Sequence, residues 1–159
     1  MDSLLKMLKE NARESDAALA KQLGTTEADV KARIATYERE GVIRGFHALL
    51  NPNRDDGSSV RAVIELRMRP ERDGGFDRLA ARIGAYPQVE ALFLMSGGFD
   101  LLLFVKGRNL KEVGEFVNGS LATLDGVIST ETHFMLKTYK DQDVLMESDP
   151  HDDRLQVCP

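Results

Sequence analysis

The amino-acid sequence predicts an α+β protein, in which an N-terminal winged helix-turn-helix is followed by a ferredoxin-like βαββαβ domain. Two patterns support this prediction. Residues 1–50 repeat apolar side chains at helical spacing between typical cap residues, whereas residues 60–138 combine two helical stripes with apolar strands. The polar, turn-rich segment NPNRDDGSS, residues 51–59, separates the two patterns as a hinge. An acidic tail, residues 139–159, completes the chain.

Three short helices account for the first unit. Residues 2–11 place leucines on one face, and Ser15 can cap a second helix that ends at Gly24, a residue suited to the positive φ found after helix C-termini. Thr26 can cap a third helix that stops at Gly41. The third helix is expected to bury three side chains at positions i, i+4 and i+7, namely Val30, Ile34 and Tyr37. Two helices joined by a short turn that contains Gly match a helix-turn-helix.

The segment after the third helix predicts a wing. VIRGFHALLNP, residues 42–52, has the β-branched start and the mid-run glycine of a small hairpin, which Pro52 closes. The exposed face of the third helix then suggests DNA binding, because its side chains suit phosphates and base edges. These residues are Glu27, Lys31, Arg33 and Thr36, with Arg39 and Arg44 beyond. A helical bundle that only dimerises is the alternative.

The second unit has the β-α-β-β-α-β order of the split βαβ pattern. Strands are expected at residues 60–69, 89–96, 100–106 and 127–137. The last strand is expected to place Ile128, Thr130, Thr132, Phe134 and Leu136 on one face. Two helical stripes lie between the strands, at Phe76, Leu79, Ala80 and Ile83 and at Leu110, Val113, Val117 and Leu121. Both helices must cover the same face of an antiparallel sheet.

The stretch LFLMSGGFDLLLFV, residues 92–105, is too apolar for a sheet with one wet face, which should alternate apolar and polar residues. Both faces of these strands should therefore be buried, although the two helices can cover only one. A second copy of the same sheet is the economical cover. The sequence thus predicts an obligate homodimer packed sheet against sheet.

A single carboxylate, Asp100, interrupts this apolar stretch. Burying it costs several kcal/mol, on the order of 2–7, unless it is hydrogen-bonded or paired. It can accept from backbone amides of the neighbouring glycine turn, or it can hold the ammonium group of a ligand. Gly97 and Gly98 either make that turn or let another group approach the backbone. The sequence alone does not decide between these alternatives.

Composition excludes several classes of protein. The net charge is −5, with eight bases and eight acids in residues 1–50, so DNA binding requires a local basic cluster rather than an overall field. The one cysteine, Cys158, rules out a disulfide framework and a cysteine metal site, and it favours a reducing compartment. No signal peptide and no apolar run of membrane-spanning length is evident. We therefore expect a cytoplasmic protein that does not associate with membranes.

Catalysis is not expected. The three histidines, His47, His133 and His151, do not lie at a metal-ligand spacing, and Ser96 has no evident base nearby. SGGFD leads from a strand into another strand, so it is not a dinucleotide fingerprint, and no P-loop is present. The sequence therefore predicts no enzyme, no metal site and no cofactor.

Taken together, these residues resemble the Lrp/AsnC (leucine-responsive, feast/famine) family of transcription factors over residues 2–138. The likeness in the first unit rests on NAR (residues 11–13), LAKQLG and EREGVIRGF, with Thr26, Val30, Arg33, Ile34, Glu38, Gly41, Val42 and Ile43 at the family's spacing. In the second unit Gly97, Phe99 and Asp100 match the family's Gly-x-aromatic-Asp motif. Thr130 and Thr132 stand where the family often has threonines.

This resemblance implies a RAM-type effector domain, a sheet-on-sheet homodimer that often assembles into octamers, and paired helix-turn-helix units on double-stranded DNA. It implies that Thr26, Lys31, Arg33, Thr36 and Arg39 face the DNA, while Arg13 and Arg44 touch its backbone. It also implies a small effector, commonly an amino acid, bound between dimers by Ser96, Gly97, Gly98, Phe99 and Asp100, with Thr130 and Thr132. The alternative function is an oligomeric metabolite sensor that does not bind DNA.

Overall fold

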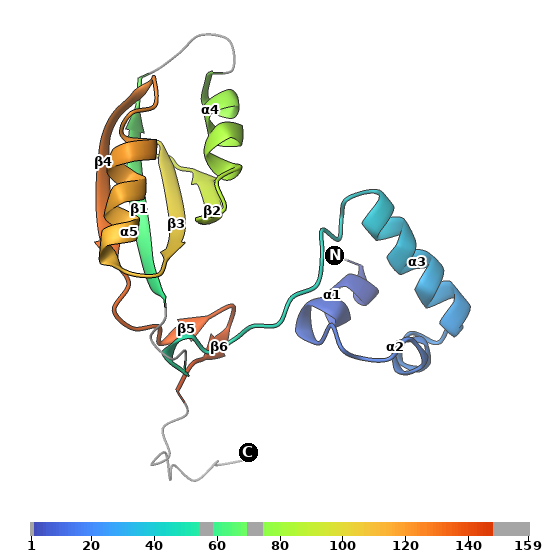
Figure 1. Ribbon diagram of the computed structural model, residues 1–159. Coiled ribbons are helices and arrows are strands. Elements are labelled where there is room, and N and C mark those ends of the chain that lie inside the picture. Colours follow the sequence, from blue (N-terminus) through green and yellow to red (C-terminus); the bar gives the residue numbers. More distant parts are fainter. Residues whose placement is uncertain (1, 55–58, 70–74, 148–159) are drawn as a thin grey trace. The chain divides into compact units, whose positions relative to one another are not determined.

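The computed structural model describes residues 2–54, 59–69 and 75–147, and it divides the chain into two compact units, Met1–Leu50 and Asn51–Pro159 (Figure 1). Each unit has its own apolar core. Among the helices in the described ranges, none combines the length and the apolar character needed to cross a membrane.

The first unit consists of three helices, α1 (Ser3–Glu10), α2 (Asp16–Leu23) and α3 (Glu27–Arg39). Each begins with a side chain that accepts a hydrogen bond from a free backbone amide: Asp2 from Leu4, Ser15 from Ala18 and Thr26 from Asp29. Gly24 ends α2 in the left-handed conformation, at φ +66°. The fully buried core is Leu4, Leu8, Leu19, Ala20 and Val30, against which Ile34 and Tyr37 pack partly buried. The predicted helix-turn-helix is thus confirmed.

The predicted wing is wrong. Residues 43–51 form neither helix nor strand, and Pro52 opens a short 3₁₀ turn, Pro52–Arg54, instead of closing a hairpin. The physical reason is that an isolated two-stranded hairpin is at best marginally stable in water, unless it packs against another apolar surface. Val42, Phe46 and Leu50 are 55%, 50% and 76% exposed, so this segment buries too little to hold a hairpin in the single chain.

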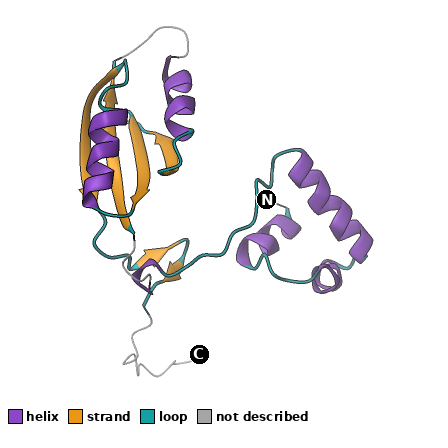
Figure 2. Cartoon of the chain, viewed as in Figure 1, coloured by secondary structure: helices purple, strands orange, loops and turns teal. Residues whose placement is uncertain are grey.

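The second unit is a four-stranded antiparallel sheet with two helices on one face, which confirms the ferredoxin-like prediction (Figures 1 and 2). Its elements follow in the order β1 (Val60–Met68), α4 (Gly75–Gly84), β2 (Val89–Leu94), β3 (Leu101–Gly107), α5 (Leu110–Phe116) and β4 (Val127–Phe134). The strand order in space is β2-β3-β1-β4. The second helical stripe, predicted to extend to Leu121, leaves α-helical geometry after Phe116, because Val117–Leu121 forms a π-helical turn, labelled η2.

The core of this unit lies between the sheet and the helices. Alternate residues of β1 and β3 point into it, and Ile83, Val113, Phe116 and Leu121 meet them from the helices. The inward-facing strand residues are Ala62, Ile64, Leu66, Met68, Leu101, Leu103 and Val105.

The prediction for β4 needs a correction. Thr130, Thr132 and Phe134 do share a face, opposite Leu66, Ile64 and Ala62 of β1, but Ile128 does not belong with them. The register shifts between Arg67 and Met68, where Val127 rather than Ile128 pairs with Met68, and Ile128 is 63% exposed. Such a bulge places one extra residue on one strand and moves its side chain off the alternating pattern. Leu136 lies beyond the end of the strand and is 96% exposed.

The C-terminal extension begins with a small hairpin. Strands β5 (Lys140–Asp141) and β6 (Val144–Leu145) flank a turn at Gln142 and Asp143, both at positive φ. The hinge packs against this region: Asn53 exchanges two hydrogen bonds with the backbone of Thr138, and the Asn51 side chain donates to the Met146 carbonyl. The segment predicted as an acidic tail, residues 139–159, therefore contains regular structure and packs on the hinge as far as Met146, a buried residue. The LQVCP end, residues 155–159, lies outside the described residues.

Candidate nucleic-acid and effector sites

The surface of α3 that points away from the core carries small side chains. Ala28, Ala32 and Ala35 are exposed, at the helical positions opposite Val30 and Ile34. These alanines carry no charge that would mark them as a binding surface in the sequence, although they recur at the same three- and four-residue spacing as a core stripe. A methyl surface lets a helix approach a groove closely and can contact the methyl group of thymine.

Basic and hydroxyl groups flank this alanine surface. The Lys31 ammonium lies 2.7 Å from a Glu27 carboxylate oxygen and 4.0 Å from Asp16, and the hydrogen bond to Glu27 raises the pKa of Lys31. Arg39 is exposed, and its guanidinium donates to the Thr36 hydroxyl over 3.2 Å. The Thr26 hydroxyl is the N-cap of α3. Arg13 and Arg44 are exposed in the same unit.

Arg33 pairs with acidic side chains of its own unit. Its Nη2 donates to both oxygens of Asp2, at 2.8 and 2.9 Å, and its Nη1 lies 3.7 Å from Asp29. Tyr37 and Asp2 together raise the pKa of Arg33. Burial alone would raise the pKa of Asp2, but hydrogen bonds from the Leu4 amide and from the Tyr37 and Arg33 side chains outweigh it, and the pKa is lowered. Arg33 thus links α3 to Asp2, the N-cap of α1.

The connection between β2 and β3 contains the predicted effector residues. Ser96, Gly97 and Gly98 are exposed, while Phe99 and Asp100 are half-buried. Gly97 has φ +129°, a conformation that L side chains rarely adopt. A Cβ at Gly98 would lie 4.0 Å from the Arg67 guanidinium, which is ordinary contact, so a larger side chain fits there.

The Asp100 carboxylate completes the β1–β3 ladder. Its Oδ2 accepts from the Met68 amide at 2.6 Å, and its own amide donates to the Leu66 carbonyl at 2.8 Å. The donor therefore belongs to β1, and the sequence-based alternative that placed it in the glycine turn had the wrong partner. One hydrogen bond uses only part of the accepting capacity of an ionised carboxylate, which is about four lone-pair sites.

The two threonines do not adjoin this turn. Thr130 and Thr132 are half-buried on the helix-covered face of β4, and β1 lies between β4 and β3. A hollow of about 170 Å³ opens instead beside three arginines, Arg69, Arg78 and Arg82, with Asp125. None of the residues predicted to bind an effector lines that hollow.

The sheet face away from the helices is apolar on one half. An apolar patch lies on β1, β2 and β3 and consists of Val63, Ala91, Phe93, Leu102 and Phe104, which the register places side by side. The Phe93 and Phe104 rings meet edge to face, with centroids 6.1 Å apart, and Phe93 is 50% exposed. The predicted apolar character of both faces is confirmed, and in the single chain the outer face is open. The cover by a second copy stays a prediction.

Comparisons with known proteins agree with this architecture. Residues 3–38 match the AsnC-type helix-turn-helix domain, and residues 61–145 match the Lrp/AsnC ligand binding domain. An uncharacterized HTH-type transcriptional regulator of Bacillus subtilis, YugG, is 38% identical over 157 residues, covering 98% of this chain and 95% of that protein. The leucine-responsive regulatory protein of Haemophilus influenzae is 28% identical, covering 90% and 86%.

A solved structure is similar over nearly the same length. A transcriptional regulator of Neisseria meningitidis in complex with L-Met is 26% identical and gives a TM-score of 0.70, covering 89% of this chain and 93% of that one. These similar proteins are described as transcriptional regulators, not as enzymes.

Proposed function

Because the chain belongs to the Lrp/AsnC family of transcriptional regulators, with a helix-turn-helix and a ligand-binding domain, we propose that it reads a specific DNA sequence as a dimer and responds to a small effector, for which an amino acid is the best candidate. The observation that carries the DNA part is the exposed face of α3. It combines a methyl surface with Lys31, Thr36 and Arg39, and a major groove can accept such a helix. This proposal places the protein in the cytoplasm.

The dimer part rests on the apolar patch. Phe93 and Phe104 lie in the half of the sheet face that is covered by no helix within the described residues. A contiguous exposed apolar patch marks an interaction surface, and a second copy of the chain offers the same patch by symmetry. Two recognition helices in such a dimer would meet pseudo-palindromic half-sites about one helical turn apart, or a multiple of it. Assembly into octamers belongs to the same proposal and requires further surfaces.

The effector part rests on Asp100. A free amino acid carries an ammonium group, and the exposed residues Ser96, Gly97 and Gly98 stand just before a carboxylate that can accept further hydrogen bonds. The bound L-Met in the similar regulator from Neisseria meningitidis supports an amino acid as the class of ligand. Because Thr130 and Thr132 lie across β1 from this turn, a contact of theirs with the same ligand requires a neighbouring subunit.

A metabolite sensor that does not bind DNA is the second candidate. It is favoured by the ion pairs that engage Lys31 and Arg33 with acids of their own unit. The salt dependence of DNA affinity distinguishes the regulator from the sensor. Phosphate contacts release counterions, so the logarithm of the affinity falls with the logarithm of the salt concentration with a slope of about −0.9 for each phosphate contact.

The test is fluorescence anisotropy of the full-length protein on a labelled duplex from its own upstream DNA, from low to high salt. A regulator binds with a steep negative slope, and unlabelled random DNA competes less well than unlabelled specific DNA. Arg39→Ala should weaken binding, whereas Lys111→Ala, an exposed cation of the second unit, is the matched control. Absence of DNA affinity at low salt, with amino-acid binding intact, would establish the sensor instead.

A further inference from the structure

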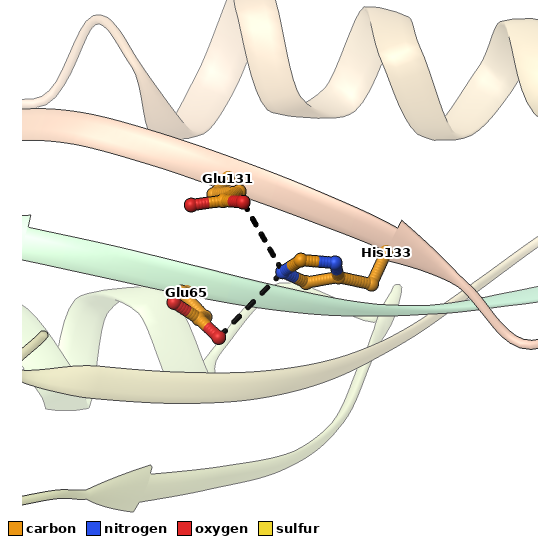
Figure 3. Close-up of side chains that lie close together, drawn as sticks. All are labelled: Glu65, Glu131 and His133. Atoms are coloured by element: carbon orange, nitrogen blue, oxygen red, sulfur yellow. Dashed lines mark ion pairs between the residues drawn. The ribbon is translucent and has the colours of Figure 1, made fainter. Parts of the chain in front are cut away.

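Two strands of the sheet bring three potential metal ligands together on the outer face. Glu65 of β1 lies directly opposite Glu131 of β4, and His133 follows two residues later on the same face of β4. The His133 Nε2 atom is 3.6 Å from a Glu65 oxygen and 3.8 Å from a Glu131 oxygen (Figure 3). One ligand atom from each of the three residues lies within 4.8 Å of the other two.

The register makes this cluster unfavourable without a cation. Like charges that lie directly opposite each other on antiparallel strands destabilise the pair. Here both carboxylates flank one imidazole, whose positive charge depends on protonation. The side chains of Glu65, His133 and Glu131 are 30%, 51% and 72% exposed, so an ion from solvent can reach the cluster.

We propose that Glu65, Glu131 and His133 bind one divalent transition-metal ion, with Zn²⁺ as the best match. One imidazole nitrogen and two carboxylate oxygens form a donor set that suits zinc better than magnesium or calcium, which take oxygen ligands. Two ligands of a tetrahedral zinc ion with bonds of about 2.1 Å lie about 3.4 Å apart. The two distances from His133 exceed this value by a few tenths of an ångström, which small side-chain rotations can close.

Metal binding would act on the proposed dimer surface. Glu65 pairs in register with Leu102, and His133 lies next to Val63, so the cluster adjoins the apolar patch. A divalent ion neutralises the two carboxylates and thereby lowers the desolvation free energy of burying the cluster of Glu65, Glu131 and His133 in an interface. Zinc should therefore strengthen association of two chains. This consequence rests on the sheet-against-sheet dimer of the proposed function, whereas the metal site itself does not.

The test is isothermal titration of ZnCl₂ into full-length, tag-free protein previously treated with a chelator, with MgCl₂ as the comparison. We expect one zinc ion per chain and no magnesium binding at the same concentrations. Glu131→Gln and His133→Gln should each weaken zinc binding at least about tenfold, since even residues that only orient ligands contribute 10–100-fold. His47→Gln and His151→Gln are matched controls and should leave the affinity unchanged.

The outcomes separate the possibilities. Equal zinc affinity in the wild type and in His133→Gln would overturn the site, as would loss of binding in His151→Gln alone. Glu131→Gln keeps the test informative if His133→Gln unfolds, because Glu131 is the most exposed of the three side chains. Sedimentation equilibrium with and without zinc tests the link to association. If zinc leaves the dimer association constant unchanged while zinc binding still requires Glu131 and His133, the link to association is overturned and the metal site is sustained.

Discussion

Replacement of Asp100 separates a structural role of its carboxylate from a role in effector binding. In the structure the carboxylate accepts from the Met68 amide at 2.6 Å, and Met68 is 5% exposed. Asp100→Ala leaves this buried amide without its acceptor. Asp100→Asn keeps an acceptor oxygen in the same place but removes the negative charge that would attract an ammonium group.

The expected size of the effect follows from that hydrogen bond. A bond to a charged group contributes about 1.5–3 kcal/mol, so Asp100→Ala should lower the free energy of unfolding by about 2 kcal/mol. For a unit of this size, about 2 kcal/mol corresponds to a fall in Tm of roughly 8–16 °C. Asp100→Asn should lose less than half as much, because a neutral hydrogen bond replaces a charge-assisted one.

Thermal unfolding followed by circular dichroism measures the first effect. The shift in Tm caused by a panel of L-amino acids measures the second, and it should disappear in Asp100→Asn as well as in Asp100→Ala. Glu115→Ala, which removes an exposed carboxylate of α5, is the control and should match the wild type in both measurements. Wild-type stability in Asp100→Ala would refute the structural role, and an undiminished ligand-induced shift in Asp100→Asn would refute the effector role.

Three further predictions concern the other surfaces. Phe104→Glu, in the apolar patch, should convert the dimer to a monomer in sedimentation equilibrium, whereas Leu110→Glu, exposed at the start of α5, should not; a dimeric Phe104→Glu protein would contradict the sheet-against-sheet arrangement. Arg33→Ala should lower the Tm of the first unit because it removes the partner of Asp2, the N-cap of α1, while Arg39→Ala should lower DNA affinity and leave that Tm unchanged; the reverse pattern would show that Arg33 is the DNA contact. The Arg108 amide and guanidinium lower the pKa of Glu112 below 4.5, so its contribution to stability is present above that pH and is lost as pH falls through the folded-state value. An acid titration of Tm should therefore be flatter in Glu112→Gln, and parallel curves would exclude this carboxylate.

The local features of the fold were predictable because their causes lie within a few residues of sequence. Ser15 and Thr26 cap helices through amides three residues away, and Gly24 ends α2 by its own conformation. The inward face of β1 follows from strict alternation. The wing was not predictable in the same way, because the stability of a hairpin depends on what packs against it, and residues 43–51 have too little to pack against in the single chain.

Candidate site residues could be named from the sequence, but their partners in the fold could not. Arg33 and Asp2 are 31 residues apart, and Asp100 and Met68 are 32 apart, so each contact depends on how the elements pack. The cluster of Glu65, Glu131 and His133 was not predicted from the sequence, for a related reason. The three histidines do not stand at a metal-ligand spacing along the chain, whereas His133 meets Glu65 only through the antiparallel register of β1 and β4.

These contacts limit what the two most prominent charged residues can do for a ligand. Asp2 accepts from Nη2 of Arg33, so a phosphate that uses this nitrogen would have to displace Asp2 and give up the link between α3 and the N-cap of α1. Asp100 is under no such constraint, because a carboxylate that accepts one backbone amide can still accept an ammonium group without rearrangement. We therefore propose that Lys31, Thr36 and Arg39, around the three alanines on the exposed face of α3, make the DNA contacts in the described conformation. In this proposal Arg33 supports DNA binding by fixing the orientation of the helix that carries them.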